Sequence, residues 1–350
     1  MKPEIEKKLE NKNIEHRITM PESAMIAKIE ASLIDGAREY CRNNDYQLIA
    51  IPHLTKATGA CENFSTLFST DLFGNTAYLN QTGQLMLEAF METYKKVYCD
   101  GPSFRKEIKA DNRHLIEFPL FEIEVANHNL EELKTEISNI FSSMISKVEK
   151  DCNKELEHLV KDNSFLNNLK PPYKSITYRD AINKLSKYDL KFGDDLKSEH
   201  ELYLVNLNQD KPLFITNYPQ EIKFFNMRLN REDNTIVNSM DLIMPYSGEA
   251  VGAAEREENH LILKKRLNDS SMLELLKEAM TKETGYENCT KQEIHTKALE
   301  RFDWYMNIIK SYPITHAGCG IGINRVTQSI LQTKDIRYAT AFPMNRETLF

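Results

Sequence analysis

The stretch GPSFRKEIKADNRHLIEFPLFEIEV, residues 101–125, decides the fold of this 350-residue chain. Its second arm, residues 118–125, alternates apolar and acidic residues at about two-residue spacing, the pattern of a half-buried strand. We therefore expect two antiparallel strands, joined by a basic loop and carrying an inward-facing Arg105. Because a planar guanidinium can hold two phosphate or carboxylate oxygens at once, the hairpin suits a polyphosphate. A surface hairpin with solvated charges is the alternative at this point.

The composition excludes several classes of protein. The net charge of -7 argues against a surface that is a nucleic-acid footprint throughout, although a local basic patch is compatible with it. The six cysteines form no CxxC pair and no cluster with histidines, so neither a zinc site nor a disulfide framework is predicted. No apolar run is long enough for a signal peptide or a membrane span, which leads us to expect a cytoplasmic protein.

Periodicity predicts further helices and strands on both sides of the hairpin. A long amphipathic helix is expected from Pro21 to Asn44, followed by a short edge strand that ends at Pro52. Residues 55–69 are polar and small, which is typical of a mobile loop over a site. A helix from Leu85 to Tyr94 carries Glu88, and its N-terminus is suited to receive an anion. Helices are also predicted within 129–169, and strands at 213–217, 223–229 and 236–244.

Two features in the second half point to a ligand. Asp241 and Glu249 lie on neighbouring predicted segments and could share a magnesium ion with substrate phosphates, because hard cations take one or two carboxylates in such sites. Near the C-terminus, the glycines at 318, 320 and 322 let a strand lie close to a ligand, and Arg325 then starts an amphipathic helix. The GxGxxG spacing of a dinucleotide-binding site is missing.

The chain resembles the class II aminoacyl-tRNA synthetases in the order of three features. These are the Arg-bearing hairpin, the helix with its proline-ended strand, and the glycine-rich strand. The amino-acid sequence of several segments resembles the catalytic domain of the asparaginyl-tRNA synthetases, from about Arg17 to Phe342. It includes YLNQTGQL (78–85), FRKE (104–107), RHLIEF (113–118), FGDDLKSEHE (192–201), NYPQEIKFFNMRLN (217–230), MDLIMPYSGEAVGAAEREE (240–258) and HAGCGIGINR (316–325). The resemblance implies an α+β fold, an antiparallel β-sheet flanked by helices, as one catalytic domain over residues 1–350 with a mainly helical insertion at about 129–170.

The resemblance also implies a role for each matching residue on the ATP side. Arg105 would hold the α-phosphate of ATP and the activated carboxylate, Phe118 would stack on adenine, and Arg325 would reach the γ-phosphate. The other residues implied to contact ATP are Glu107, Arg113 and His114. Arg105 and Arg325 are the residues expected to be catalytic.

On the amino-acid side, the resemblance implies that Asp241 and Glu249 hold Mg²⁺ and that Gln84 and Glu122 meet the substrate's amino group. The residues implied to face the other end of the amino acid are Glu88 and Arg256. A carboxylate at Glu88 accepts a hydrogen bond from an asparagine amide but repels a free aspartate carboxylate. An aspartate turned so that its amino group meets Glu88 is the alternative orientation.

The sequence departs from the family pattern in features related to tRNA. It leaves no room before the catalytic segments for the OB-fold that reads the anticodon, so we expect no such domain. Asn324 also stands where the family has an acid, and Ala253-Ala254 where it has Gly-Ser. ATP-dependent, AMP-forming activation of aspartate or asparagine is the expected activity.

Three hypotheses follow for the acceptor. The first, ranked highest, is tRNA-independent synthesis of asparagine from aspartate and ammonia, as implied by the likeness to archaeal paralogues without the anticodon domain. The second is a synthetase that passes the adenylate to tRNA or another nucleophile, and the third is a non-catalytic paralogue that binds ATP or the amino acid. The first helix and the strand ending at Pro52 resemble the family's dimer-forming motif, so a homodimer is expected.

Overall fold

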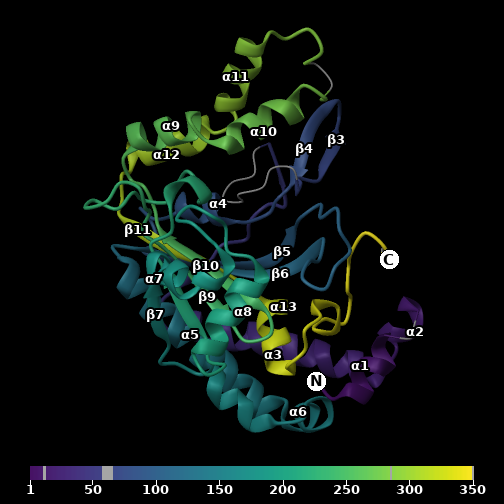
Figure 1. Cartoon of the computed structure of the whole chain (residues 1–350). Helices are drawn as coiled ribbons and strands as arrows, with labels where there is room; N and C mark the ends of the chain where they lie inside the picture. The colour runs from purple at the N-terminus through teal and green to yellow at the C-terminus, as the bar shows by residue number, and fades with distance from the viewer. Residues whose placement is uncertain (11–12, 57–65, 284–285, 349–350) are drawn as a thin grey trace.

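The computed structural model describes residues 1–10, 13–56, 66–283 and 286–348, and its centre is an eight-stranded sheet (Figure 1). The strands follow the order β1 (Gln47–Leu48), β5 (Lys96–Phe104), β6 (Glu117–Ala126), β11 (His316–Gly322), β10 (Gly248–Glu255), β9 (Ser239–Met244), β8 (Leu213–Thr216) and β7 (Lys174–Thr177). The outermost pairs, β1 with β5 and β7 with β8, are parallel, and the pairs between them are antiparallel. The predicted α+β fold with a mainly antiparallel sheet flanked by helices is confirmed.

Residues 101–125 form most of the hairpin β5–β6, with Phe104 opposite Glu117 at its loop end. Along β6 the apolar side chains of Phe121, Ile123 and Val125 are fully buried in the main core. The intervening carboxylates point to the other face of the sheet, because successive side chains of a strand alternate between faces. On β11, glycines stand opposite both carboxylates, Gly320 beside Glu122 and Gly318 beside Glu124.

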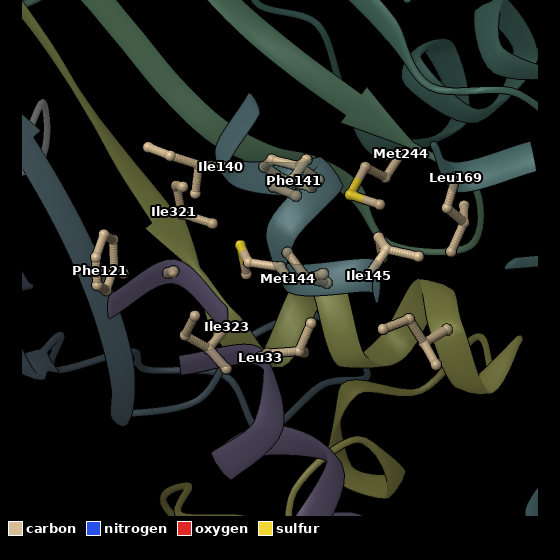
Figure 2. Close-up of a cluster of buried hydrophobic side chains, with 14 of the residues drawn as sticks. Leu33, Phe121, Ile140, Phe141, Met144, Ile145, Leu169, Met244, Ile321 and Ile323 are labelled. Atoms are coloured by element: carbon tan, nitrogen blue, oxygen red, sulfur yellow. The ribbon is translucent and has the colours of Figure 1, made fainter. Parts of the chain in front are cut away.

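Helices cover the apolar face of this sheet. The layer consists of α3 (Pro21–Asn43), α5 (Leu130–Asp151) and α13 (Ile323–Leu331), joined by α6 (Asn153–Leu159) and the 3-10 helix η2 (Asn163–Leu169). Figure 2 shows Leu33 of α3, Phe141 of α5 and Ile323 of α13 among the buried side chains of this core. The predicted first helix is confirmed and ends one residue earlier, at Asn43, and helices lie within 130–169 as expected.

Shorter elements cover the two ends of this layer. Near the N-terminus, α1 (Pro3–Glu10) and α2 (Ile14–Ile18) precede α3, and α1 buries Ile5 and Leu9. A smaller core beside β7 and β8 involves α7 (Tyr178–Lys184), η3 (Ser186–Tyr188), α8 (Ser198–Leu207) and η4 (Gln220–Ile222), and η5 (Ile336–Tyr338) lies near the C-terminus. In the part of the chain that the structure describes, no helix is long and apolar enough to cross a membrane.

A separate helical lobe lies at the top of Figure 1, beside the strands β3 and β4. Its helices are α9 (His260–Asn268), α10 (Ser271–Met280), α11 (Lys291–Glu300) and α12 (Asp303–Ser311), and the neighbouring small sheet has the order β2 (Leu54–Thr55), β4 (Asn75–Leu79), β3 (Ser69–Leu72). The lobe has its own apolar core, which Tyr78 of β4 and Leu85 join. Leu85 belongs to α4 (Gln84–Glu88), so the lobe packs directly onto the helix that begins after Gly83.

Several sequence-based predictions of elements differ from the structure. The edge strand expected to end at Pro52 is β1, which ends at Leu48, and the strand expected at 236–244 begins at Ser239. The predicted strand 223–229 is wrong: this segment follows η4 as irregular backbone with isolated bridges such as Met227 to Arg256. Its Phe224, Phe225 and Asn226 are all buried, which a strand with one buried face does not allow. The predicted helix 85–94 is shorter, because α4 gives way after Glu88 to turns. The polar segment 55–69 lies partly outside the described residues.

Candidate active site

One cavity of about 270 Å³ lies on the face of the sheet opposite the helical layer, and it is lined by eleven of the twelve residues that the sequence analysis singled out. They are Gln84, Arg105, Glu107, Arg113, His114, Phe118, Glu122, Asp241, Glu249, Arg256 and Arg325. They come from the hairpin β5–β6, from β9 and β10, and from the starts of α4 and α13. The twelfth, Glu88, is not among the lining residues.

The hairpin supplies a cation and an aromatic ring at one end of the cavity. The Arg105 guanidinium lies 5.5 Å from the centre of the Phe118 ring. The two residues lie at the loop end of β5–β6, so the register of the hairpin sets their distance. In the loop between the strands, His114 Nδ1 lies 2.9 Å from the Asp111 carboxylate, which also accepts hydrogen bonds from the Arg113 and His114 amides. Hydrogen bonds to Asp111 therefore stabilise the conformation of the basic loop.

Arg325 reaches the same end of the cavity from the first turn of α13. Its guanidinium donates to the carbonyl oxygen of Glu249, and burial lowers the pKa of Arg325. Arg113 Nη2 lies 3.1 Å from Glu201 Oε2, and that carboxylate also accepts from the Glu249 amide at 3.4 Å. Three arginines, Arg105, Arg113 and Arg325, thus meet around one space, an arrangement that suits the charge of a triphosphate.

Glu201 was not predicted as a site residue. It is buried on α8, and burial raises the pKa of its carboxyl group. Gly248 has a φ of +76°, and a Cβ there would lie 2.3 Å from Glu201 Oε2. The turn before β10 therefore requires a glycine, both for its backbone conformation and for the room that Glu201 takes.

Asp241 and Glu249 suit a magnesium ion, because they face the same point of the sheet. A Cβ built on Gly252 would lie 3.3 Å from Glu249 Oε1 and 3.9 Å from Asp241 Oδ1. Among the described residues, no group of three or more His, Cys, Asp or Glu side chains could hold a metal ion by itself. Two carboxylates with phosphate and water as the remaining ligands match the way proteins bind Mg²⁺.

Lys223, which was not predicted as a site residue, forms an ion pair with Asp241. Lys223 Nζ lies 2.8 Å and 3.1 Å from the two oxygens of Asp241, and it also lies 4.2 Å from the centre of the Tyr218 ring. Lys223 comes from the irregular segment that had been predicted as a strand. The cavity therefore contains a protein cation at the position where Asp241 would meet a metal.

At the other end of the cavity, Glu122 is held at the start of α4. The Gly83 amide donates to Glu122 Oε2 at 2.7 Å, and the Thr82 hydroxyl donates to Glu122 Oε1. The anion expected at this helix N-terminus is thus a carboxylate of the protein itself. Burial raises the pKa of Glu122, and these two donors oppose the rise.

Glu88 lies behind the wall of the cavity, and its carboxylate is surrounded by donors. Oε1 accepts from Gln84 Nε2 at 2.8 Å and from Asn226 Nδ2 at 3.0 Å. Oε2 accepts from Tyr305 OH at 2.7 Å and lies 3.1 Å from His316 Nε2. Gln84 lines the cavity, so Glu88 is linked to the cavity wall through this side chain.

Arg256 is the cation at this end, and a second buried glutamate holds it. Arg256 Nη2 donates to Glu124 Oε1 at 2.7 Å and Nε donates to the same oxygen at 3.1 Å, whereas Glu88 Oε1 lies 4.0 Å from Nε. The carboxylates around the guanidinium raise the pKa of Arg256. Gly318 makes room for Glu124, since a Cβ there would lie within 2.4 Å of its carboxylate atoms.

His316 completes this network from the start of β11. Its Nδ1 lies 2.7 Å from the Ile314 carbonyl oxygen and its Nε2 faces Glu88, so both ring nitrogens face acceptors. Only the doubly protonated imidazolium can donate at both positions, and the neighbouring Glu88 raises the pKa of His316 against the effect of burial. The ring therefore carries a positive charge beside Glu88.

Besides Glu201, sequence reasoning missed five members of the site: Glu124, Lys223, Asn226, Tyr305 and His316. The alternation along β6 placed Glu124 on the same face as Glu122, and His316 stands two residues before the first close-approach glycine. Those local signals could have identified two of the five. Asn226 and Tyr305 come from irregular backbone and from the helical lobe, so only the tertiary fold brings them to Glu88.

Comparison with known proteins agrees with this geometry. The family described as class II tRNA synthetases (D, K and N) matches residues 5–346. The asparagine–tRNA ligase of Herpetosiphon aurantiacus is 34% identical over 351 residues, covering 94% of this chain and 72% of the relative, and that of Mycoplasma genitalium is 34% identical over 345 residues, covering 93% and 70%.

Among solved structures, asparaginyl-tRNA synthetase from Pyrococcus horikoshii in complex with asparaginyl-adenylate superimposes with a TM-score of 0.83 at 29% identity, covering 96% of this chain and 73% of that chain. Both the sequence match and the structural match span nearly all the elements described above. The chain therefore belongs to the class II aminoacyl-tRNA synthetases of the D, K and N group and is an AMP-forming ligase related to the asparaginyl-tRNA synthetases.

Proposed function

We propose that the protein activates asparagine with ATP, forming asparaginyl-adenylate and pyrophosphate. The observation that carries this proposal is the division of one cavity into an end with three arginines and an end with Glu122, Gln84 and Arg256. The relatives named asparagine–tRNA ligase and the structural neighbour that holds asparaginyl-adenylate support the same choice.

In the proposed reaction, an α-carboxylate oxygen of the amino acid attacks the α-phosphorus of ATP. An oxygen–phosphorus bond forms, the bond to the bridging oxygen of the β-phosphate breaks, and pyrophosphate leaves. No covalent nucleophile is needed, because alignment of the two reactants and cations that balance the developing charge supply the catalysis. Arg105 would balance charge at the α-phosphate, and Arg325 and Arg113 would hold the leaving phosphates.

Mg²⁺ is proposed as the cofactor, held by Asp241 and Glu249 together with phosphate oxygens. When bound, the ion would supply further positive charge to the phosphates. Lys223 would balance Asp241 until then. Glu122 would accept a hydrogen bond from the substrate's ammonium group, and Phe118 and Arg105 would hold the adenine and α-phosphate between them.

Synthesis of asparagine from aspartate and ammonia is the second candidate. The observation that favours it is the pairing of a cation, Arg256, with the polar side chain of Gln84 at the amino-acid end. A zwitterionic α-amino and α-carboxylate group is neutral overall and would suit this end, leaving the side-chain carboxylate of aspartate beside Arg105. Ammonia would then displace AMP from the aspartyl adenylate.

One assay separates these reactions. The purified protein is given Mg²⁺, ATP and either asparagine or aspartate, and pyrophosphate exchange is measured with each amino acid. Exchange with asparagine that exceeds exchange with aspartate is expected. Release of AMP and of new asparagine from aspartate only when ammonium is added would favour the second candidate instead. No exchange with either amino acid would contradict both.

The acceptor of the adenylate is tested in the same experiment with tRNA added. Labelled asparagine that becomes acid-precipitable with tRNA would support transfer to tRNA, whereas adenylate that accumulates unchanged would point to another nucleophile.

We further propose that residues 1–350 form one catalytic domain and that two copies associate through α3 and the exposed edge strand β1. Light scattering coupled to gel filtration would measure the mass in solution, and a monomer at micromolar concentration would contradict the dimer.

A further inference from the structure

The guanidinium of Arg256 has two distinct sides. Nε and Nη2 are turned toward Glu124, at 3.1 Å and 2.7 Å from one carboxylate oxygen, and Arg256 also lines the cavity. Both side chains are almost fully buried. A substrate that enters therefore meets an arginine whose charge is already balanced by a carboxylate behind it.

The position of Glu124 is fixed by the sheet. It is the β6 partner of Gly318 on β11, and any larger residue at 318 would occupy the space of the Glu124 carboxylate. Arg256 follows directly after β10, and its amide donates to the His316 carbonyl oxygen at 2.9 Å. Three neighbouring strands thus hold the two charged groups in register, so the pair is part of the framework of the site.

The charges of Arg256 and three neighbouring side chains sum to zero, and a fifth charged side chain, Glu122, would be balanced by the substrate's ammonium group. Arg256 and the imidazolium of His316 are positive, and Glu124 and Glu88 are negative. Bringing the side-chain carboxylate of aspartate into this neutral, buried network would leave one negative charge without a counter-ion, which is costly away from water. The uncharged amide of asparagine adds no charge and can accept a hydrogen bond from the guanidinium.

We propose that Glu124 is a positioning residue that sets the preference for an amide over a carboxylate, by balancing the charge of Arg256. This inference rests on the proposed activation of asparagine. Glu124 does not touch the substrate: it acts through Arg256. If its charge were removed, the network around Arg256 would carry a net positive charge beside the cavity, and the site would accept aspartate.

The test is the variant Glu124→Gln, measured by pyrophosphate exchange with asparagine and with aspartate separately. We expect the ratio of kcat/KM for asparagine over aspartate to fall at least tenfold, mainly through a lower KM for aspartate. Glu124→Asp, which keeps the charge, should retain most of the preference. The matched control is Glu136→Gln, which removes another buried, ion-paired glutamate at Lys96, outside the cavity lining, and should leave the ratio unchanged.

The outcomes are distinguishable. A ratio within twofold of the wild-type ratio in Glu124→Gln, with the KM for ATP retained, would overturn the role of Glu124 while leaving the proposed function intact. Failure of the wild-type protein to activate asparagine would instead overturn the proposed function. A general loss of activity with both amino acids in equal proportion would show a structural role only.

A measurement on the wild-type protein covers the case in which Glu124→Gln does not fold. The groups around Glu124 are Glu122 on its own strand, Arg256 after β10, His316 on β11 and Glu88 on α4, and burial raises the pKa of Glu124 to about 7. Below that pH Glu124 is increasingly protonated, and lowering the pH can only add protons to His316, so the network gains positive charge. The preference for asparagine should therefore fall as the pH is lowered from 8 to 6, and a preference that is constant or rises would contradict the proposal.

Discussion

Arg105 directly follows β5, at the end of the strand from which the hairpin loop begins. It also lines the cavity. Its guanidinium is fixed beside the Phe118 ring, and its backbone amide donates to the Ile116 carbonyl oxygen at 2.8 Å across the loop. A planar fork held in this way can bind an α-phosphate and a carboxylate together, which a lysine ammonium does as a point charge only. The chemistry expected of this residue therefore depends on the shape of its side chain as well as on its charge.

The first prediction is that Arg105→Lys loses most of the activation step. Removal of one preorganised donor from a transition state typically costs about 10²–10³-fold in kcat, and we expect a loss of that order in pyrophosphate exchange. The control is Arg42→Lys, at an exposed position at the end of α3, which should leave the rate unchanged. Retention of the wild-type rate in Arg105→Lys would show that the arginine does not act on the α-phosphate.

At the scale of elements, the close contact of α3 with α5 depends on a glycine. A Cβ on Gly36 would lie 2.7 Å from Met144 Cα and 2.9 Å from the Ser143 carbonyl oxygen, both of which are backbone atoms. Glycine in a helix interior costs roughly 1 kcal/mol relative to alanine. Its presence here is explained by the packing of the two helices, because backbone atoms cannot turn aside as a flexible side chain can.

We predict that Gly36→Ala lowers the free energy of unfolding even though alanine favours the helix. Overpacking against a rigid neighbour typically costs about 1–3 kcal/mol, which exceeds the gain in helix propensity of roughly 1 kcal/mol. Urea unfolding followed by circular dichroism measures the difference. Glu39→Ala, an exposed change on the same helix, serves as control and should shift the value by no more than ~0.5 kcal/mol. A stabilised Gly36→Ala variant would mean that the helices can separate freely.

The elements that could be predicted from sequence are those whose signals are local. The alternation along β6 and the helical spacing within α3 and α13 appear in the residues themselves, and all three elements occur where expected. The strand prediction for residues 223–229 failed because Phe224 and Phe225 pack against the helical lobe and Asn226 bonds to Glu88. These partners lie far away in the chain. The candidate site divides in a similar way: eleven predicted residues line the cavity, whereas Lys223, which also lines it, and the buried partners behind the wall other than Glu88 were missed.

At the scale of the whole molecule, the helical lobe and the amino-acid end of the cavity are joined by a small number of polar contacts. Tyr305 of α12 donates to Glu88 at 2.7 Å. On the other side of the lobe, Arg301 Nη2 lies 2.6 Å from Glu283 Oε2, and Tyr78 of the small sheet donates to the same carboxylate group. The lobe thus holds both the helix α4 that carries Glu88 and the strand β4 that leads to it.

The last prediction tests whether this connection reaches the substrate. Tyr305→Phe removes one of the four donors to a buried carboxylate, which typically costs about 1–3 kcal/mol of stability. Because Glu88 also holds Gln84 in the wall of the cavity, we expect the KM for the amino acid to rise severalfold while the KM for ATP, which would bind at the other end, stays the same. Tyr312→Phe, at an exposed position just after α12, is the matched control and should alter neither constant. If Tyr305→Phe lowers stability but leaves both KM values at wild-type levels, the lobe supports the fold of the pocket without affecting what the pocket binds. If both KM values rise together, the lobe orders the whole cavity and not its amino-acid end alone.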